Sequence, residues 1–219
     1  MTLDIYWGSG SGPAWRVLLA AGIKGLPFNS HLLSFSDREH KTEQFLAINP
    51  RGRVPAIVHD GFALNESLAI LAYLDAAFPD SPRLLGTDAQ STGLIWAGIF
   101  MVENHFAEAL NKVRRPIFNG KTDGFDATEY FEILRKELAG FNEVLSGRQF
   151  LQGDSVTAHD VVLAVHVMTL ERAIVKAPDG FLPTDIASPR ATWPALGAWC
   201  VRMEAQPGWD AAYPPHWRG

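Results

Sequence analysis

The spacing of apolar residues changes near residue 80, and this change constrains the fold more than any other feature of the sequence. Before it, short strand-like runs alternate with helix-like runs in the order βαβαββα, which indicates a mixed sheet covered by helices. The segment Pro79–Gly86 contains three breakers, and every later run has helical spacing. We therefore predict an α/β domain over residues 1–79, a linker over 80–87 and an all-α bundle domain over 88–219.

Glycine and proline mark the ends of the elements expected in the first domain. A strand over residues 3–7 stops at the turn cluster 8–13, and the helix that follows ends between Gly22 and Gly25. The run His59-Asp60-Gly61 is typical of a tight turn between two strands. The other expected strands cover residues 27–32, 54–58 and 61–64, and the other expected helices cover residues 45–48, 67–78, 88–119, 126–145, 157–175 and 193–205.

Composition and charge exclude several classes of protein. The chain is 47% hydrophobic and 20% charged, which is typical of a folded globular protein and too apolar for a disordered one. Its net charge of -5 argues against a nucleic-acid partner, which would call for a basic surface. The apolar runs are shorter than the roughly 20 residues of a membrane span, and no signal peptide follows Met1. We expect a soluble, cytoplasmic protein with no nucleic-acid or membrane partner.

Three motifs of the first domain occur in a fixed order. Ser11 precedes Arg16 by five positions at the start of the first expected helix. Residues 49–57 read NPRGRVPAI, and residues 65–70 read NESLAI. Together these motifs resemble the serine-type glutathione transferases, of the theta-like or a related bacterial class. The resemblance is close over the first 80 residues, and it implies a thioredoxin-like domain followed by a helical bundle domain.

The resemblance also implies roles for individual residues in binding glutathione. The bond between Val54 and Pro55 would be cis, so that the Val54 backbone pairs with the cysteinyl unit. Glu66 would approach the α-amino group of the ligand. Ser67 would cap the next helix, whose N-terminus would hold the γ-glutamyl carboxylate. The alternatives are that Pro55 only ends an edge strand, and that Glu66 and Ser67 are an exposed acid and an ordinary helix cap.

The glycine carboxylate of glutathione has three candidate partners. His40 and Arg53 align with family positions that bind this group, and Lys41 is adjacent to one of them. The alternative is that these side chains belong to a solvated charged loop, since Ser36–Lys41 carries several charges.

The reactive sulfur is expected to belong to glutathione rather than to the protein. A free thiol has a pKa near 8.5, and lowering it by about two units takes roughly 2.7 kcal/mol of preference for the anion. One hydroxyl donor at a helix N-terminus supplies this order of magnitude. By resemblance Ser11 is the catalytic donor, whereas Ser9 in the same loop is the alternative donor. Arg16 would support the site electrostatically, and the alternative for it is a structural ion pair. The single cysteine, Cys200, lies far from this loop and is expected to be a buried apolar residue.

The second domain is expected to supply the pocket for a hydrophobic co-substrate. The candidate lining residues on its first long helix are Phe100, Asn104 and His105, and Trp15 on the first helix of the chain is a further candidate. Ordinary core packing is the alternative for each of them. Thr157 and Asp160 have the spacing of a capping box, to which we assign a role in folding. The histidines show no metal-ligand spacing, so we expect no metal site.

These features predict a glutathione transferase that transfers the glutathionyl group to a hydrophobic electrophile. The resemblance implies glutathione as a co-substrate, no permanently bound cofactor and a homodimer. Three alternatives stay open at this point: a glutathione-dependent isomerase of zeta-like type, a peroxidase, and a non-catalytic binding protein with the same fold. The loop SGPAWRV lacks the Ser-Cys pair of zeta-like enzymes, which disfavours the isomerase.

Overall fold

The computed structural model describes residues 2–217 and divides them into two compact units. The first unit runs to Leu85 and resumes at Gln206, and the second spans Gly86–Ala205. The boundary at Leu85 falls within the predicted linker. The predicted second domain, in contrast, extended to residue 219, beyond the described residues. The segment after Gln206 groups with the first unit because its aromatic side chains pack against the first helix of the chain.

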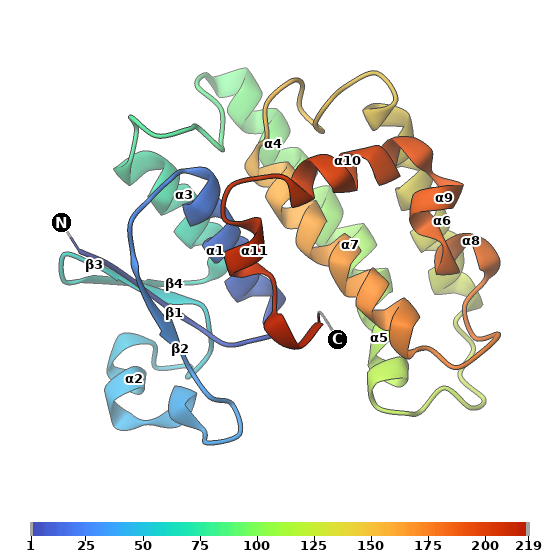
Figure 1. Ribbon diagram of the computed structural model, residues 1–219, viewed down its shortest axis with the longest axis horizontal. Coiled ribbons are helices and arrows are strands. Elements are labelled where there is room, and N and C mark those ends of the chain that lie inside the picture. Colours follow the sequence, from blue (N-terminus) through green and yellow to red (C-terminus); the bar gives the residue numbers. More distant parts are fainter. Residues whose placement is uncertain (1, 218–219) are drawn as a thin grey trace. The chain divides into compact units, whose positions relative to one another are not determined.

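The first unit is built on a four-stranded mixed sheet in the order β2-β1-β3-β4 (Figure 1). The central pair β1 and β3 is antiparallel, and Ile5 faces Ile57 with both side chains fully buried. β2 pairs with β1 in parallel, while β3 and β4 form the predicted hairpin. The strands are β1 (Leu3–Trp7), β2 (Asn29–Leu32), β3 (Ala56–His59) and β4 (Phe62–Asn65).

Helices pack on this sheet and close the predicted βαβαββα order. The longest, α1, is buried along almost its whole length and packs against α3 and α11. It ends at Ile23 with Lys24 as its C-cap, and Gly25 beyond the cap adopts a φ of 64° that favours glycine. The helices of this unit are α1 (Gly12–Ile23), α2 (Glu43–Ile48), α3 (Ser67–Ala77) and α11 (Trp209–Ala212), with short 3₁₀ turns at Glu39–Lys41 and Pro215–Trp217.

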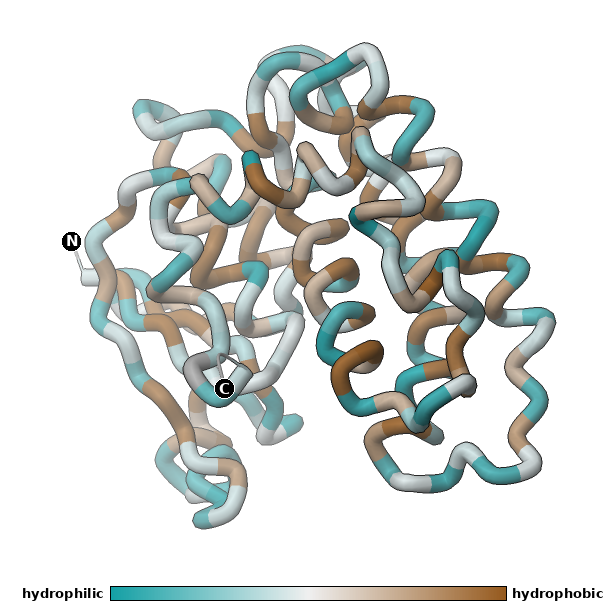
Figure 2. The backbone as a smooth tube through the Cα atoms, turned by 45° about the vertical axis from the view of Figure 1, so that its right-hand side comes forward, coloured by the Kyte–Doolittle hydropathy of each residue, from teal (hydrophilic) through white to brown (hydrophobic). Residues whose placement is uncertain are grey.

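The second unit is all-helical, as predicted, and Figure 2 shows apolar residues recurring along its helices. α7 is its central element and buries most of its side chains. The single long helix predicted over 88–119 is interrupted by one π-helical turn, Val102–Phe106. The helices are α4 (Ala89–Met101), α5 (Ala107–Phe118), α6 (Thr128–Leu145), α7 (Ala158–Lys176), α8 (Thr184–Ala187), α9 (Pro189–Thr192) and α10 (Pro194–Glu204). Among the described residues, no helix is both long and apolar enough to cross a membrane.

The predicted capping box opens α7 and extends into the core of this unit. Asp160 is fully buried, and its Oδ2 accepts hydrogen bonds from the amide and the hydroxyl of Thr157 at 2.9 and 2.8 Å. Its Oδ1 accepts from the amide of Leu151 at 2.9 Å and from Nε1 of Trp199 at 3.0 Å. One carboxylate therefore joins the start of α7 to the preceding loop and to α10.

Candidate active site

Ser11 lies where the first turn of the chain becomes α1. It is the N-cap of that helix, and its backbone amide donates to the carbonyl of Gly8 at 3.1 Å. Its half-buried hydroxyl accepts from the amide of Ala14 at 3.4 Å. A hydroxyl that accepts one hydrogen bond still has its own proton to donate. The first turn of α1 contains no acidic residue, so the positive end of the helix dipole is uncompensated there.

Ser9, the alternative donor, already has a side-chain partner. Its Oγ lies 2.9 Å from Nδ1 of His216, a residue of the C-terminal segment. Sequence reasoning did not identify His216, because neither periodicity nor any motif connects residue 216 with residue 9. Ser9 and Ser11 therefore differ in environment although they share one turn.

Arg16 is buried inside the first unit, with 4% of its surface exposed. Its Nη1 donates to the hydroxyl of Ser67 at 3.4 Å. This contact connects the first half of α1 with the first residue of α3. Arg16 therefore links the two helix N-termini that the sequence analysis assigned to glutathione.

The start of α3 differs from the sequence expectation in one respect. We predicted Ser67 as the N-cap, but Glu66 occupies that position and Ser67 is the first helical residue. The prediction of the cap was wrong because the Ser67 hydroxyl contacts Arg16 instead of the backbone of its own helix. Glu66 has a φ of 68° and a ψ of 107°, which is strained for a residue with a side chain. Its carboxylate is exposed and lies 3.7 Å from Nη1 of Arg51.

The loop before β3 holds the remaining residues implied by the resemblance. The Val54–Pro55 peptide bond is cis, as expected, with Pro55 buried and Val54 half-buried. Lys41 braces this loop, because its Nζ donates to the carbonyls of Arg51 and Gly52 at 3.2 and 2.7 Å.

The two family-aligned candidates for the glycine carboxylate differ in exposure. Arg53 is exposed, and its carbonyl accepts from Nδ2 of Asn49 at 2.6 Å. His40 is half-buried, its ring meeting that of Phe35 edge-on at 5.2 Å. Its Nδ1 is buried, and no described residue forms a hydrogen bond with it.

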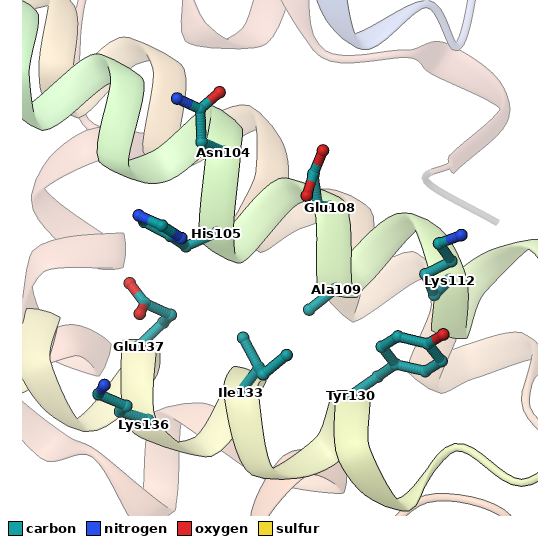
Figure 3. Close-up of a pocket in the computed structure, with 9 residues that line it drawn as sticks. All are labelled: Asn104, His105, Glu108, Ala109, Lys112, Tyr130, Ile133, Lys136 and Glu137. Carbon is teal, nitrogen blue, oxygen red and sulfur yellow. The ribbon is translucent and has the colours of Figure 1, made fainter.

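The four candidate co-substrate residues lie in different surroundings. Trp15 is 2% exposed and packs in an aromatic cluster of the first unit, as expected of a core residue rather than of a pocket residue. Phe100 is half exposed and stacks on Trp96 at 5.8 Å. Asn104 and His105 line a groove of about 300 Å³ between the π-turn and α5 on one side and α6 on the other (Figure 3).

Both apolar and charged side chains line this groove. Ala109 and Ile133 face each other across it in Figure 3. The remaining lining residues are Glu108, Lys112, Tyr130, Lys136 and Glu137. Of these, sequence reasoning placed only Glu108 among the candidates on the first long helix. Their charges differ from the hydrophobic lining expected for the co-substrate pocket, whose position therefore stays a prediction.

Cys200 is buried on α10, as predicted. Desolvation raises the pKa of its thiol to about 12, so the thiol is protonated at neutral pH. Within residues 2–217, no group of three or more His, Cys, Asp or Glu side chains is arranged to hold a metal ion.

Comparison with known proteins agrees with these features. The model of the glutathione S-transferase N-terminal domain matches residues 11–77, and that of the glutathione S-transferase C-terminal domain matches residues 107–207. Glutathione S-transferase 1 of Dianthus caryophyllus is 30% identical over 169 residues, which cover 76% of each chain. Glutathione S-transferase D7 of Drosophila melanogaster is 31% identical over 172 residues, covering 77% of this chain and 75% of that one.

A solved structure agrees over the whole length. The glutathione S-transferase of the Antarctic clam Laternula elliptica superposes with a TM-score of 0.83 at 28% identity, covering 100% of this chain and 94% of the clam chain. The two domain models and the curated relatives include both the sheet unit and the helical unit. The chain therefore belongs to the glutathione S-transferase family.

Proposed function

We propose that this enzyme is a serine-type glutathione transferase, in which the hydroxyl of Ser11 stabilises the thiolate of glutathione. The observation that carries the proposal is the position of Ser11 as N-cap of α1, with its oxygen accepting from Ala14 and its proton left to donate. A sulfur held there would receive one charge-assisted hydrogen bond at the positive end of the helix. The bound thiolate then attacks an electrophilic carbon and forms a C–S bond. In a substitution the leaving group departs with its bonding electron pair, and in an addition the resulting carbanion takes up a proton.

The other ends of glutathione have matching partners in the first unit. The backbone of Val54, beside the cis bond, would pair with the cysteinyl unit. The N-terminus of α3 at Ser67 and the carboxylate of Glu66 would hold the γ-glutamyl end. His40 and Arg53 would bind the glycine carboxylate, whereas Lys41 acts on the loop that carries Arg53.

Arg16 acts as a positioning residue in this proposal. It is buried and its guanidinium contacts the Ser67 hydroxyl, so it fixes the position of the N-terminus of α3 relative to α1. Its charge is also confined to the interior, where it favours an anion at either helix N-terminus.

The test compares Ser11→Ala with Ser9→Ala. We expect Ser11→Ala to lower the ratio of thiolate to thiol in bound glutathione about 10- to 100-fold at neutral pH, and with it the thiolate fraction, because a hydrogen bond to a charged group contributes roughly 1.5–3 kcal/mol. Ultraviolet difference absorbance of the thiolate at saturating glutathione measures this fraction, and calorimetric titration measures binding separately.

Ser9→Ala is the matched control. It should bind glutathione and lose less of the thiolate than Ser11→Ala does. Loss of the thiolate in Ser9→Ala with retention in Ser11→Ala would assign the donor to Ser9, and no binding of millimolar glutathione to the unchanged enzyme would overturn the proposal.

A second prediction concerns Glu66. Glu66→Gln should weaken glutathione binding about 2- to 5-fold, since the exposed carboxylate contributes only a screened attraction to the ligand's ammonium. Glu66→Gly should also weaken binding, yet raise the free energy of unfolding by about 1 kcal/mol, because glycine adopts a φ of 68° without strain. Calorimetric titration and urea unfolding measure the two effects, and equal stability of the Gln and Gly variants would contradict the strain argument.

We further propose a small apolar electrophile as co-substrate and a cytoplasmic homodimer as the working form. Exposed apolar side chains on α4, among them Leu94 and Met101, support an interface, because such residues gain by burial. One activated sulfur supports substitution, addition and peroxide reduction alike, so rates with an aryl halide, an enal and an organic hydroperoxide would rank these reactions.

A further inference from the structure

The C-terminal segment of the first unit lies along the helix that begins at Ser11. α11 packs against α1, and Figure 1 shows the two side by side. Their backbones touch: a Cβ atom on Gly22 would lie 2.6 Å from the Cα of Gly208, closer than side chains come to a backbone. Only glycine fits at this crossing, so the start of the segment is fixed against α1.

An aromatic cluster holds the rest of the segment in place. Trp15, one turn beyond Ser11 in α1, is buried at its centre. The segment contributes three rings that meet Trp15 edge-on, with centroids 5.3, 5.2 and 5.8 Å away: Trp209, Tyr213 and Trp217. Edge-to-face contacts of this kind stabilise beyond the area that they bury. The segment is therefore anchored on the first turns of the proposed catalytic helix.

This anchoring brings His216 to the turn that precedes Ser11. Its Nδ1 lies 2.9 Å from the hydroxyl of Ser9. Its ring also covers Gly10, where a Cβ atom would lie 3.1 Å from Cε1 and 3.2 Å from Nε2. Gly10 has a φ of 82°, so both its backbone and its neighbour exclude a side chain.

A second ring closes the turn from another segment. A Cβ atom on Gly8 would overlap the ring of Phe35. The amide of Ser11 donates to the carbonyl of Gly8 across the turn. The backbone between residues 8 and 11 is thus held by Phe35 at Gly8, and by His216 at Ser9 and Gly10.

We propose that His216 is a positioning residue for glutathione activation, acting through its hydrogen bond to Ser9. The bond fixes the turn that presents the Ser11 hydroxyl, and its loss lets that hydroxyl move away from the sulfur. The inference rests on the proposed role of Ser11, and it assigns to the C-terminal segment a part in activation that neither the motifs nor the domain models contain.

The experiment uses the full chain with three changes at residue 216. His216→Ala removes the bond. His216→Asn retains a polar atom near the position of Nδ1, whereas His216→Gln places its amide further out, near the position of Nε2. The thiolate fraction of saturating bound glutathione is measured by ultraviolet difference absorbance for each, with tryptophan fluorescence reporting whether the aromatic cluster stays packed.

We expect His216→Ala and His216→Gln to lower the ratio of thiolate to thiol about 2- to 10-fold, the range that one net hydrogen bond supports, and His216→Asn to restore it. In a Ser9→Ala background, His216→Ala should add no further loss. Full thiolate in His216→Ala, equal loss in the Asn and Ala variants, or additive losses with Ser9→Ala would each overturn the proposal.

The role of Ser11 is decided separately from that of His216. Ser11→Ala with an unaltered residue 216 tests the donor, and the coupling between residues 9 and 216 tests the positioning bond. Retained thiolate in Ser11→Ala would therefore overturn the proposed donor, while a thiolate fraction insensitive to His216→Ala would overturn only the inference drawn from the C-terminal segment.

Discussion

Asp75→Ala should lower the free energy of unfolding of the first unit by about 3–5 kcal/mol, the cost of leaving a buried charge without its partner. Lys24 and Asp75 are both almost completely buried, and Nζ of Lys24 lies 3.1 Å from Oδ1 of Asp75. The same carboxylate accepts from the amides of Leu84 and Leu85 at 2.7 and 3.3 Å, and from Arg83 at 3.0 Å. Removing it leaves one cation and two amides buried with fewer partners. Urea unfolding followed by circular dichroism measures the loss.

Two variants in the same network provide graded controls. Lys24→Met should cost less than Asp75→Ala, because the carboxylate would keep Arg83 and the two amides. Arg83→Met should cost at most about 1 kcal/mol, since the Arg83 side chain is 39% exposed and its charge is screened. The reverse order, with Arg83→Met the most damaging, would contradict the argument from burial.

The same network gives a dependence on pH. Burial alone would raise the pKa of Asp75, but the Leu84 amide and the Lys24 ammonium outweigh it and hold the pKa below its usual value. An acid with a depressed pKa in the folded state stabilises the fold above its unfolded pKa, and that contribution is lost as pH falls through the folded value. The difference in stability between the unchanged protein and Asp75→Ala should therefore shrink below about pH 4.

Most of the fold followed from periodicity and from breakers. Alternation over residues 3–7 and the turn at Asp60 and Gly61, whose φ values are 47° and 88°, identified strands that the sheet contains. The π-turn at Val102–Phe106 was missed because both flanking segments are α-helical and a single turn is too short to show a spacing of its own. The placement of α11 was missed because it depends on contacts across most of the chain, which local spacing does not encode.

The site was predictable where it depends on local sequence. Ser11 directly precedes the helix that it caps, and Asp160 lies three positions after the Thr157 that it contacts. The bond between Arg16 and Ser67 and that between Ser9 and His216 join residues 51 and 207 positions apart. A motif assigns a role to such a residue, but only the folded chain shows which partner satisfies it.

These long-range contacts bear on the chemistry in a common way. None of them is expected to touch the sulfur of glutathione, yet each fixes the backbone from which a binding group projects. Arg16 does so for the N-terminus of α3, and Lys41 does so for the loop at Gly52. A displacement of about 1 Å in such a group can cost on the order of 100-fold in rate. Activity should therefore be more sensitive to these residues than their distance from the reacting atoms suggests.

Asp160→Ala should lower the free energy of unfolding of the second unit by about 3–5 kcal/mol. The carboxylate accepts hydrogen bonds from four donors, which lie on the preceding loop, at the start of α7 and on α10. Its loss leaves the Leu151 amide, the Thr157 amide and the Trp199 indole without an acceptor. Each buried donor without an acceptor costs roughly 1–3 kcal/mol, and three of them exceed the gain from no longer burying a charge. Thermal and urea unfolding measure the change.

Asp160→Asn and Trp199→Phe separate two contributions to stability, that of the hydrogen-bond donors and that of the buried charge. Burial raises the pKa of Asp160, so an amide in its place relieves the desolvation of an anion. The amide oxygen can accept from two of the donors, and the Thr157 hydroxyl can rotate to accept in turn, which leaves the Thr157 amide facing an N–H group. Asp160→Asn should thus cost about 1–3 kcal/mol and Trp199→Phe about 1 kcal/mol. If Asp160→Asn were as stable as the unchanged protein, the burial of charge would outweigh the unsatisfied donor, and the large loss in Asp160→Ala would have to come from the cavity instead.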